Sequence, residues 1–130
     1  MTAALATRPR IRRTIDEVLA DARLGLDRIT PAQARDAWAA GAVVVDIRPA
    51  AQRAAEGELP GALLIERNVL EWRFDPLNDA RLPIADHDLQ VIVLCQEGYT
   101  SSLAAAALQE LGVHRATDVI GGYAAWRDLL

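Results

Sequence analysis

The stretch that most constrains the fold is a short apolar run that leads through a turn directly into a helix. Val91 to Leu94 is aliphatic at every position, which is typical of a strand buried on both faces of a sheet. The next helical pattern, from about Ser101 to Leu111, begins only a few residues later. Cys95, the only cysteine of the chain, therefore falls in a tight turn between a buried strand and a helix.

This turn offers favourable surroundings for a thiolate, although a lone cysteine can also be a small core residue. The first N–H groups of the helix lack partners within it and carry the positive end of its dipole. Gly98 permits a positive φ that lets successive N–H groups converge, and hydroxyl groups follow it at Thr100, Ser101 and Ser102. Because a core cysteine needs neither feature, we predict that Cys95 is reactive.

Three other short runs predict further strands: Ala42 to Ile47, Ala62 to Ile65 and Thr117 to Ile120. Helical patterns between strands imply right-handed crossovers and therefore a parallel sheet. In such sheets ligands bind beyond the carboxyl ends of the strands. The residues that follow each strand are therefore candidates for a site.

Charged residues follow two of these strands. Asp46 and Arg48 end the first strand, where they form either an ion pair that stabilises the fold or part of a chemical site. Arg67 follows the second strand. Because an anion site needs a cation and the cysteine turn contains none, we predict that Arg67 supplies positive charge to the site.

The first 28 residues differ from the rest of the chain. Residues 1–13 are small, polar and basic, with no apolar stretch of a secretory signal, and predict a flexible tail. Thr14 and Glu17 form a capping box, which predicts a helical extension over residues 14–28 that covers the domain or contacts a partner. Residues 29–130 are then one domain.

Composition excludes several classes of protein. A net charge of −4 argues against a nucleic-acid or anionic membrane surface, and no apolar run is long enough to span a bilayer. One cysteine and two separated histidines, His87 and His114, predict neither a disulfide framework nor a metal site, and no motif calls for a cofactor. A free thiol suits a reducing compartment, so we expect a cytoplasmic location.

Four motifs occur in an order that resembles the rhodanese-like sulfurtransferase family over about residues 29–130. They are a strand end with the pattern Asp-x-Arg at residues 45–49, a Leu-Pro-Gly-Ala turn at 59–62, the cysteine loop at 95–101 and a closing Gly-Gly-x-x-x-Trp at 121–126. The resemblance implies an α/β three-layer sandwich with a central parallel sheet of about five strands and helices on both faces.

The resemblance also implies covalent sulfur transfer without a cofactor. Cys95 would take a sulfane sulfur from thiosulfate or a mercaptopyruvate-like donor, hold it as a persulfide and pass it to a thiol or cyanide. The backbone amides of the loop would cradle the persulfide and the departing anion. The loop residues concerned are Gln96, Glu97, Gly98, Tyr99, Thr100 and Ser101.

The loop departs from the family pattern in its charge. Gln96 and Thr100 stand where many family members have arginine or lysine. Glu97 adds a negative charge beside an anion site, which disfavours thiosulfate as the donor. Upstream, Gln52 and Glu58 replace the glutamate and histidine common in the family, which leaves the partner of Arg48 open.

Two other functions stay open. A sulfur-relay or interaction module would use the N-terminal extension to dock a partner protein in sulfur metabolism. A phosphatase or arsenate reductase would use a cysteine loop for an oxyanion, but such enzymes need arginine six places after the cysteine, where this chain has Ser101.

Overall fold

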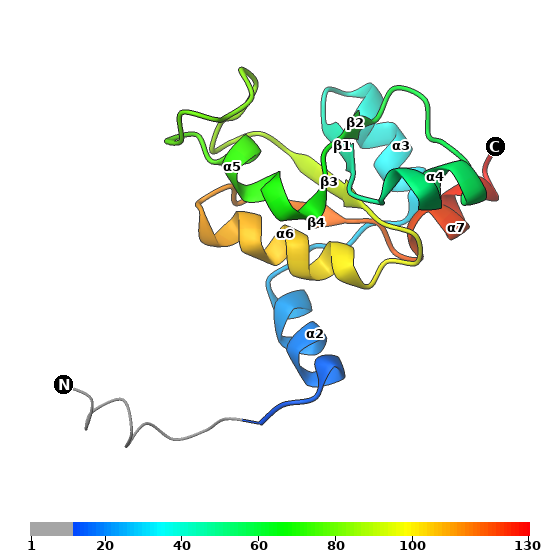
Figure 1. Ribbon diagram of the computed structural model, residues 1–130, viewed down its shortest axis with the longest axis horizontal. Helices are drawn as coiled ribbons and strands as arrows, with labels where there is room; N and C mark the ends of the chain where they lie inside the picture. The colour runs from blue at the N-terminus through cyan, green and yellow to red at the C-terminus, as the bar shows by residue number, and fades with distance from the viewer. Residues whose placement is uncertain (1–11) are drawn as a thin grey trace.

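The computed structural model describes residues 12–130, which are organised around a parallel sheet (Figure 1). The strands, in the spatial order β2-β1-β3-β4, are β2 (Leu63–Leu64), β1 (Val43–Asp46), β3 (Val91–Leu94) and β4 (Thr117–Asp118). All neighbours pair in parallel, so every strand ends at the same edge of the sheet. The predicted fold class is confirmed, with four strands rather than about five.

The place of a fifth strand is taken by a single residue. Ile29 forms an isolated parallel bridge with Val119, beyond the end of β4. The Ile29 N–H donates to Asp118 O at 3.2 Å, and the Ile120 N–H donates to Ile29 O at 2.8 Å. Thr30 directly after it already caps a helix, which stops the segment from extending as a strand.

Helices cover both faces of the sheet because its strands alternate two apolar faces. Val45, Val91 and Val93 pack with α5 (Leu70–Phe74) and α6 (Thr100–Glu110). The opposite face packs against α3 (Pro31–Ala39) and α7 (Gly122–Arg127) through the side chains of Val44, Ile92, Leu94, Ala34, Tyr123 and Trp126. This arrangement confirms the predicted three layers.

The segment between β1 and β2 contains a helix that the sequence pattern does not predict. This helix, α4 (Ala50–Glu56), buries none of its residues, so its sequence lacks the apolar stripe that marks an amphipathic helix. The irregular segment after β2 contains the short 3-10 helix η1 (Arg67–Val69) followed by α5.

The N-terminal helix α2 (Ile15–Leu24) packs against α6 outside the three layers (Figure 1). Its predicted capping box is present, since Glu17 N–H donates to Thr14 and the Glu17 carboxylate accepts from the Thr14 N–H. This backbone hydrogen bond from Thr14 lowers the pKa of Glu17. Residues 1–11 of the predicted tail lie outside the described residues.

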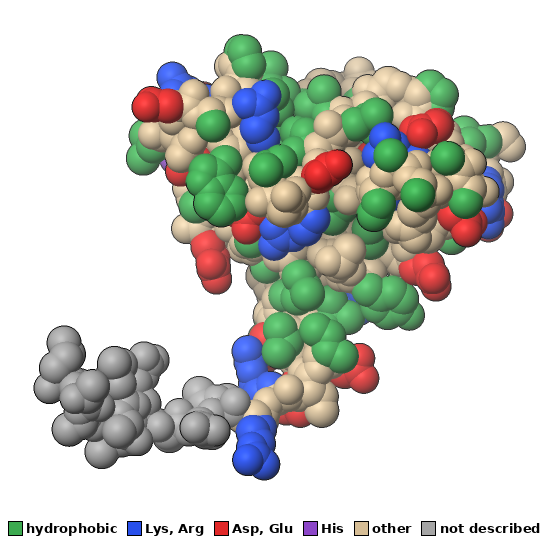
Figure 2. Space-filling model, in the orientation of Figure 1, with side chains coloured by type: hydrophobic (Ala, Val, Ile, Leu, Met, Phe, Trp, Pro, Cys, Tyr) green, Lys and Arg blue, Asp and Glu red, His purple; other side chains and the backbone are tan. Residues whose placement is uncertain are grey.

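Neither positive nor negative charge dominates the face of the molecule that Figure 2 shows. Figure 2 shows acidic and basic side chains mixed over this face, with hydrophobic side chains between them. Among residues 12–130, no helix is both long and apolar enough to cross a membrane.

Candidate active site

Cys95 follows the last residue of β3, and its thiol lies under the start of α6. The Sγ atom accepts hydrogen bonds from the N–H of Gly98 at 3.2 Å and of Ser101 at 3.4 Å. Only 5% of Cys95 is exposed. Backbone amides and the start of α6 therefore surround the sulfur with partial positive charge.

Two glycines allow the loop to take this shape. Gly98 has φ +85°, as the sequence predicts, and a Cβ there would lie 2.9 Å from Gly121 N. Gly122 has φ +60°, and a Cβ there would lie 2.5 Å from Cys95 O. The start of α7 thus lies directly against the loop, and the Tyr123 N–H donates to Cys95 O at 2.9 Å. Only glycine permits this approach.

The hydroxyl groups after Gly98 do not serve the sulfur as predicted. Ser101 Oγ donates to Asp118 Oδ2 at 2.7 Å, and Ser102 Oγ donates to the same oxygen at 2.8 Å. The physical reason is the buried carboxylate at the end of β4, which needs donors because it is wholly removed from water. Ser101 therefore donates to Cys95 Sγ with its backbone N–H and to Asp118 with its hydroxyl group.

Arginines from the N-terminal segment complete the back of the loop. Arg28 donates to both carboxylate oxygens of Asp118, at 2.9 Å and 3.2 Å, and to Gly98 O at 2.9 Å. Arg23, in the last turn of α2, donates to Gly98 O at 2.8 Å and to Ser102 Oγ at 3.0 Å. The back of the loop is therefore held by two guanidinium groups on one carbonyl oxygen.

Asp46 and Arg48 form an ion pair, which is the first of the two alternatives that the sequence left open for them. Both side chains are fully buried, and the guanidinium contacts both oxygens of Asp46, with the shortest distance 2.8 Å. Arg48 also donates to Gln96 Oε1 at 2.9 Å and lies 4.1 Å from the ring centroid of Tyr123. The partner that the sequence leaves open is therefore Asp46, and the pair connects β1 to the cysteine loop.

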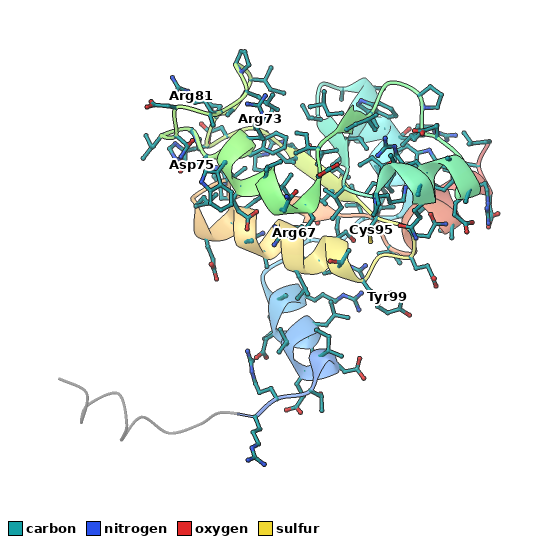
Figure 3. All side chains as sticks on the ribbon, in the orientation of Figure 1. Arg67, Arg73, Asp75, Arg81, Cys95 and Tyr99 are labelled. Atoms are coloured by element: carbon teal, nitrogen blue, oxygen red, sulfur yellow. The ribbon has the colours of Figure 1, made fainter. Side chains whose placement is uncertain are left out.

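A hollow of roughly 240 Å³ opens in front of Cys95. Its lining includes the predicted loop residues Gln96, Glu97, Tyr99 and Thr100, together with Arg48 and Gln52. Glu97 and Thr100 are exposed, and Tyr99 extends toward solvent in Figure 3. The front of the loop is therefore open and carries one carboxylate, and its only lining arginine, Arg48, is already paired with Asp46.

Arg67 lies apart from this hollow. It lines a neighbouring hollow of roughly 390 Å³, which shares Ile47, Pro49 and Thr100 with the first. Its guanidinium is 2.6 Å from the Glu71 carboxylate, its side chain is 37% exposed, and Figure 3 shows it on a different element from Cys95. Arg67 is thus brought to the rim of the site rather than to the sulfur.

Sequence reasoning missed Arg23, Arg28 and Asp118. One signal was present, because Asp118 interrupts a short run predicted to be a strand, and a carboxylate in a buried strand needs a partner. Nothing local identified Arg28 as that partner or Arg23 as a donor to the loop, since Arg28 lies 90 residues before Asp118 and Arg23 lies 75 residues before Gly98 in the chain.

The sequence and fold are similar to those of known proteins. The model of the rhodanese-like domain family matches residues 30–129. A thiosulfate sulfurtransferase GlpE of Pseudomonas entomophila (strain L48) is 36% identical over 100 residues, which cover 77% of this chain and 84% of the relative. The GlpE thiosulfate sulfurtransferase of Haemophilus influenzae (strain PittEE) is 32% identical over 104 residues, which cover 79% of this chain and 90% of the relative.

Two solved structures extend the comparison. The human single-domain sulfurtransferase TSTD1 has a TM-score of 0.62 and 26% identity, and covers 78% of this chain and 95% of its own. A protein of unknown function from Rhodopseudomonas palustris CGA009, described as a possible tyrosine phosphatase, has a TM-score of 0.81 and 31% identity. It covers 95% of this chain and 96% of its own.

Proposed function

The chain belongs to the rhodanese-like domain family, and we propose that it transfers sulfane sulfur through a persulfide on Cys95. The observation that carries this proposal is the pair of N–H donors on Cys95 Sγ, from Gly98 and Ser101, in a loop that opens to a hollow. These donors favour the thiolate before transfer and the terminal sulfur of the persulfide after it.

The reaction has two displacement steps. The Cys95 thiolate attacks the outer sulfur of the donor and forms an S–S bond with it. The rest of the donor molecule leaves with the electron pair of the broken bond, as sulfite when the donor is thiosulfate. A thiolate or cyanide then attacks the terminal sulfur, and the Cys95 thiolate leaves. Thiosulfate is the substrate named for the GlpE relatives, and the Glu97 carboxylate in the hollow disfavours it here.

The remaining predicted residues have supporting roles in this proposal. Arg48, which is paired with Asp46, donates a hydrogen bond to the side chain of Gln96 and so holds the residue that directly follows Cys95. Arg67 remains a substrate-binding residue of the adjoining hollow, where its partly exposed guanidinium can contact a donor larger than thiosulfate. A reducing compartment such as the cytoplasm suits this chemistry because the thiol must be free between turnovers.

Mass spectrometry of the intact protein tests the proposal. After incubation with thiosulfate or mercaptopyruvate, the wild type should carry one added sulfur and Cys95→Ser none, and cyanide or a thiol should remove it. Persulfide formation only from another protein would support a relay with a partner protein instead. The absence of any adduct from small donors and from proteins would overturn the proposal.

The possible tyrosine phosphatase described for the Rhodopseudomonas palustris protein calls for a direct comparison of activities. A phosphate in the hollow would meet the exposed carboxylate of Glu97, and Ser101 stands at the position where a phosphatase needs arginine. We therefore expect no hydrolysis of an aryl phosphate above the level of Cys95→Ser. Steady hydrolysis that Cys95→Ser abolishes would favour the phosphatase.

A further inference from the structure

The helix that precedes the family domain reaches the back of the cysteine loop. Arg23, in the last turn of α2, donates to Gly98 O at 2.8 Å and to Ser102 Oγ at 3.0 Å. Its guanidinium carbon also lies 5.9 Å from the ring centroid of Tyr99. One side chain of the N-terminal extension therefore contacts two residues of the loop, Gly98 and Tyr99, and one residue of α6, Ser102, although the family match begins only at residue 30.

Arg23 differs from Arg28 in its charge balance. Arg28 forms an ion pair with the fully buried carboxylate of Asp118, which neutralises it. Within residues 12–130 no ion pair involves Arg23, and residues 1–11 contain no aspartate or glutamate. Arg23 thus places an uncompensated positive charge on the Gly98 carbonyl.

This contact determines the direction of the peptide group that directly follows the one whose N–H donates to Cys95 Sγ. The peptide bond between Gly98 and Tyr99 is trans, so its C=O and N–H point in opposite directions. Since the carbonyl oxygen points to Arg23 and Arg28, the Tyr99 N–H points away from them, and Tyr99 lines the hollow of Cys95. A charge-assisted bond at the oxygen polarises the N–H of the same peptide and makes it a stronger donor.

We propose that Arg23 is a positioning residue of the active site, which orients and polarises the 98–99 peptide and supplies the positive charge that Gln96 and Thr100 do not. The inference rests on the proposed role of Cys95 as the reacting group. It gives the extension over residues 14–28 a part in the chemistry, and it places the missing cation behind the loop rather than at Arg67.

The test compares Arg23→Met with Arg23→Lys and with Arg13→Met. Arg13 is a matched control because it precedes α2, pairs with Asp21 and makes the same change in net charge without contacting the loop. Three quantities are measured for each variant: the rate of Cys95 alkylation by iodoacetamide at neutral pH, the single-turnover rate of persulfide formation from thiosulfate, and the urea midpoint of unfolding.

Arg23→Met is expected to slow both alkylation and persulfide formation about tenfold, less than the loss of a donor that touches the reacting atoms. Arg23→Lys should recover most of both rates because it keeps the charge and a donor, and Arg13→Met should match the wild type. A merely structural contact predicts the opposite for alkylation, since loosening the loop exposes a cysteine that is only 5% exposed.

Alkylation of Arg23→Met at or above the wild-type rate would overturn the inference, and so would equal losses in Arg23→Met and Arg13→Met. If alkylation slows as expected while the wild type forms no persulfide from any donor, the positioning role holds and the proposed sulfur transfer fails. The alkylation readout therefore separates the two proposals.

Discussion

The two sides of the cysteine loop differ in burial and in charge. At the front, the hollow before Cys95 is lined by the exposed side chains of Glu97 and Thr100. At the back, the Gly98 carbonyl accepts from Arg23 and Arg28. The loop therefore presents backbone N–H groups to the sulfur while its cations lie on the side away from the hollow.

In the proposed role of Arg23, a loop without its own cation can still favour an anion. A guanidinium on the carbonyl side of a peptide acts on the N–H side through the peptide dipole, so the charge need not touch the substrate. The front is then left free for donors and acceptors of different size. Variants at the back and at the front of the loop test this difference separately.

Asp118→Ala removes the carboxylate that accepts from Ser101, Ser102 and Arg28. It leaves a guanidinium without its partner beside buried hydroxyl groups. We expect the free energy of unfolding to fall by about 3 kcal/mol, at the low end for a broken buried pair because Arg28 is partly exposed. Urea unfolding measures it.

The matched variant is Asp118→Asn, which keeps an acceptor oxygen in the same place and should lose less stability. A loss below about 1 kcal/mol in Asp118→Ala, the size typical of an average substitution, would show that the back of the loop is not held by this carboxylate.

Gly122→Ala adds a methyl group at the start of α7, where it would clash with the backbone of the cysteine loop. Its Cβ would lie 2.5 Å from Cys95 O and 2.7 Å from Gly98 N, at a residue with φ +60°. We expect a loss of about 1–3 kcal/mol in unfolding free energy, as for overpacked cores, and a larger proportional loss in sulfur-transfer rate because the N–H donors move. Gly41→Ala is the control, since Gly41 also has a positive φ, +115°, but no atom within 4 Å of a Cβ. Equal transfer rates in the two variants would contradict this account.

Glu97→Lys changes only the front. Charge pairs at exposed sites are worth about 0.2–1 kcal/mol, so kcat/KM for thiosulfate should rise by up to about fivefold. The control is Glu110→Lys, which makes the same charge change at the far end of α6, about 15 Å along the helix axis. Unchanged or poorer use of thiosulfate by Glu97→Lys would show that this carboxylate does not act on the donor.

Much of the candidate site followed from local sequence. The position of Cys95 between β3 and α6 and the positive φ of Gly98 were both predicted and are both present. The capping box at Thr14 was also predicted correctly. The helix α4 was not predicted because it buries no residue and therefore has no apolar stripe to recognise.

The sequence by itself determined the strand, the turn and the place of Cys95 between them, because strand burial, helix caps and glycine conformations depend on neighbouring residues. Only the tertiary structure decided which cation serves the turn. Arg67 follows a strand end, as a residue of the site should, yet it pairs with Glu71. Arg23 reaches Gly98 across 75 residues of sequence, because the packing of α2 on α6 places its side chain there, and no local pattern encodes that contact.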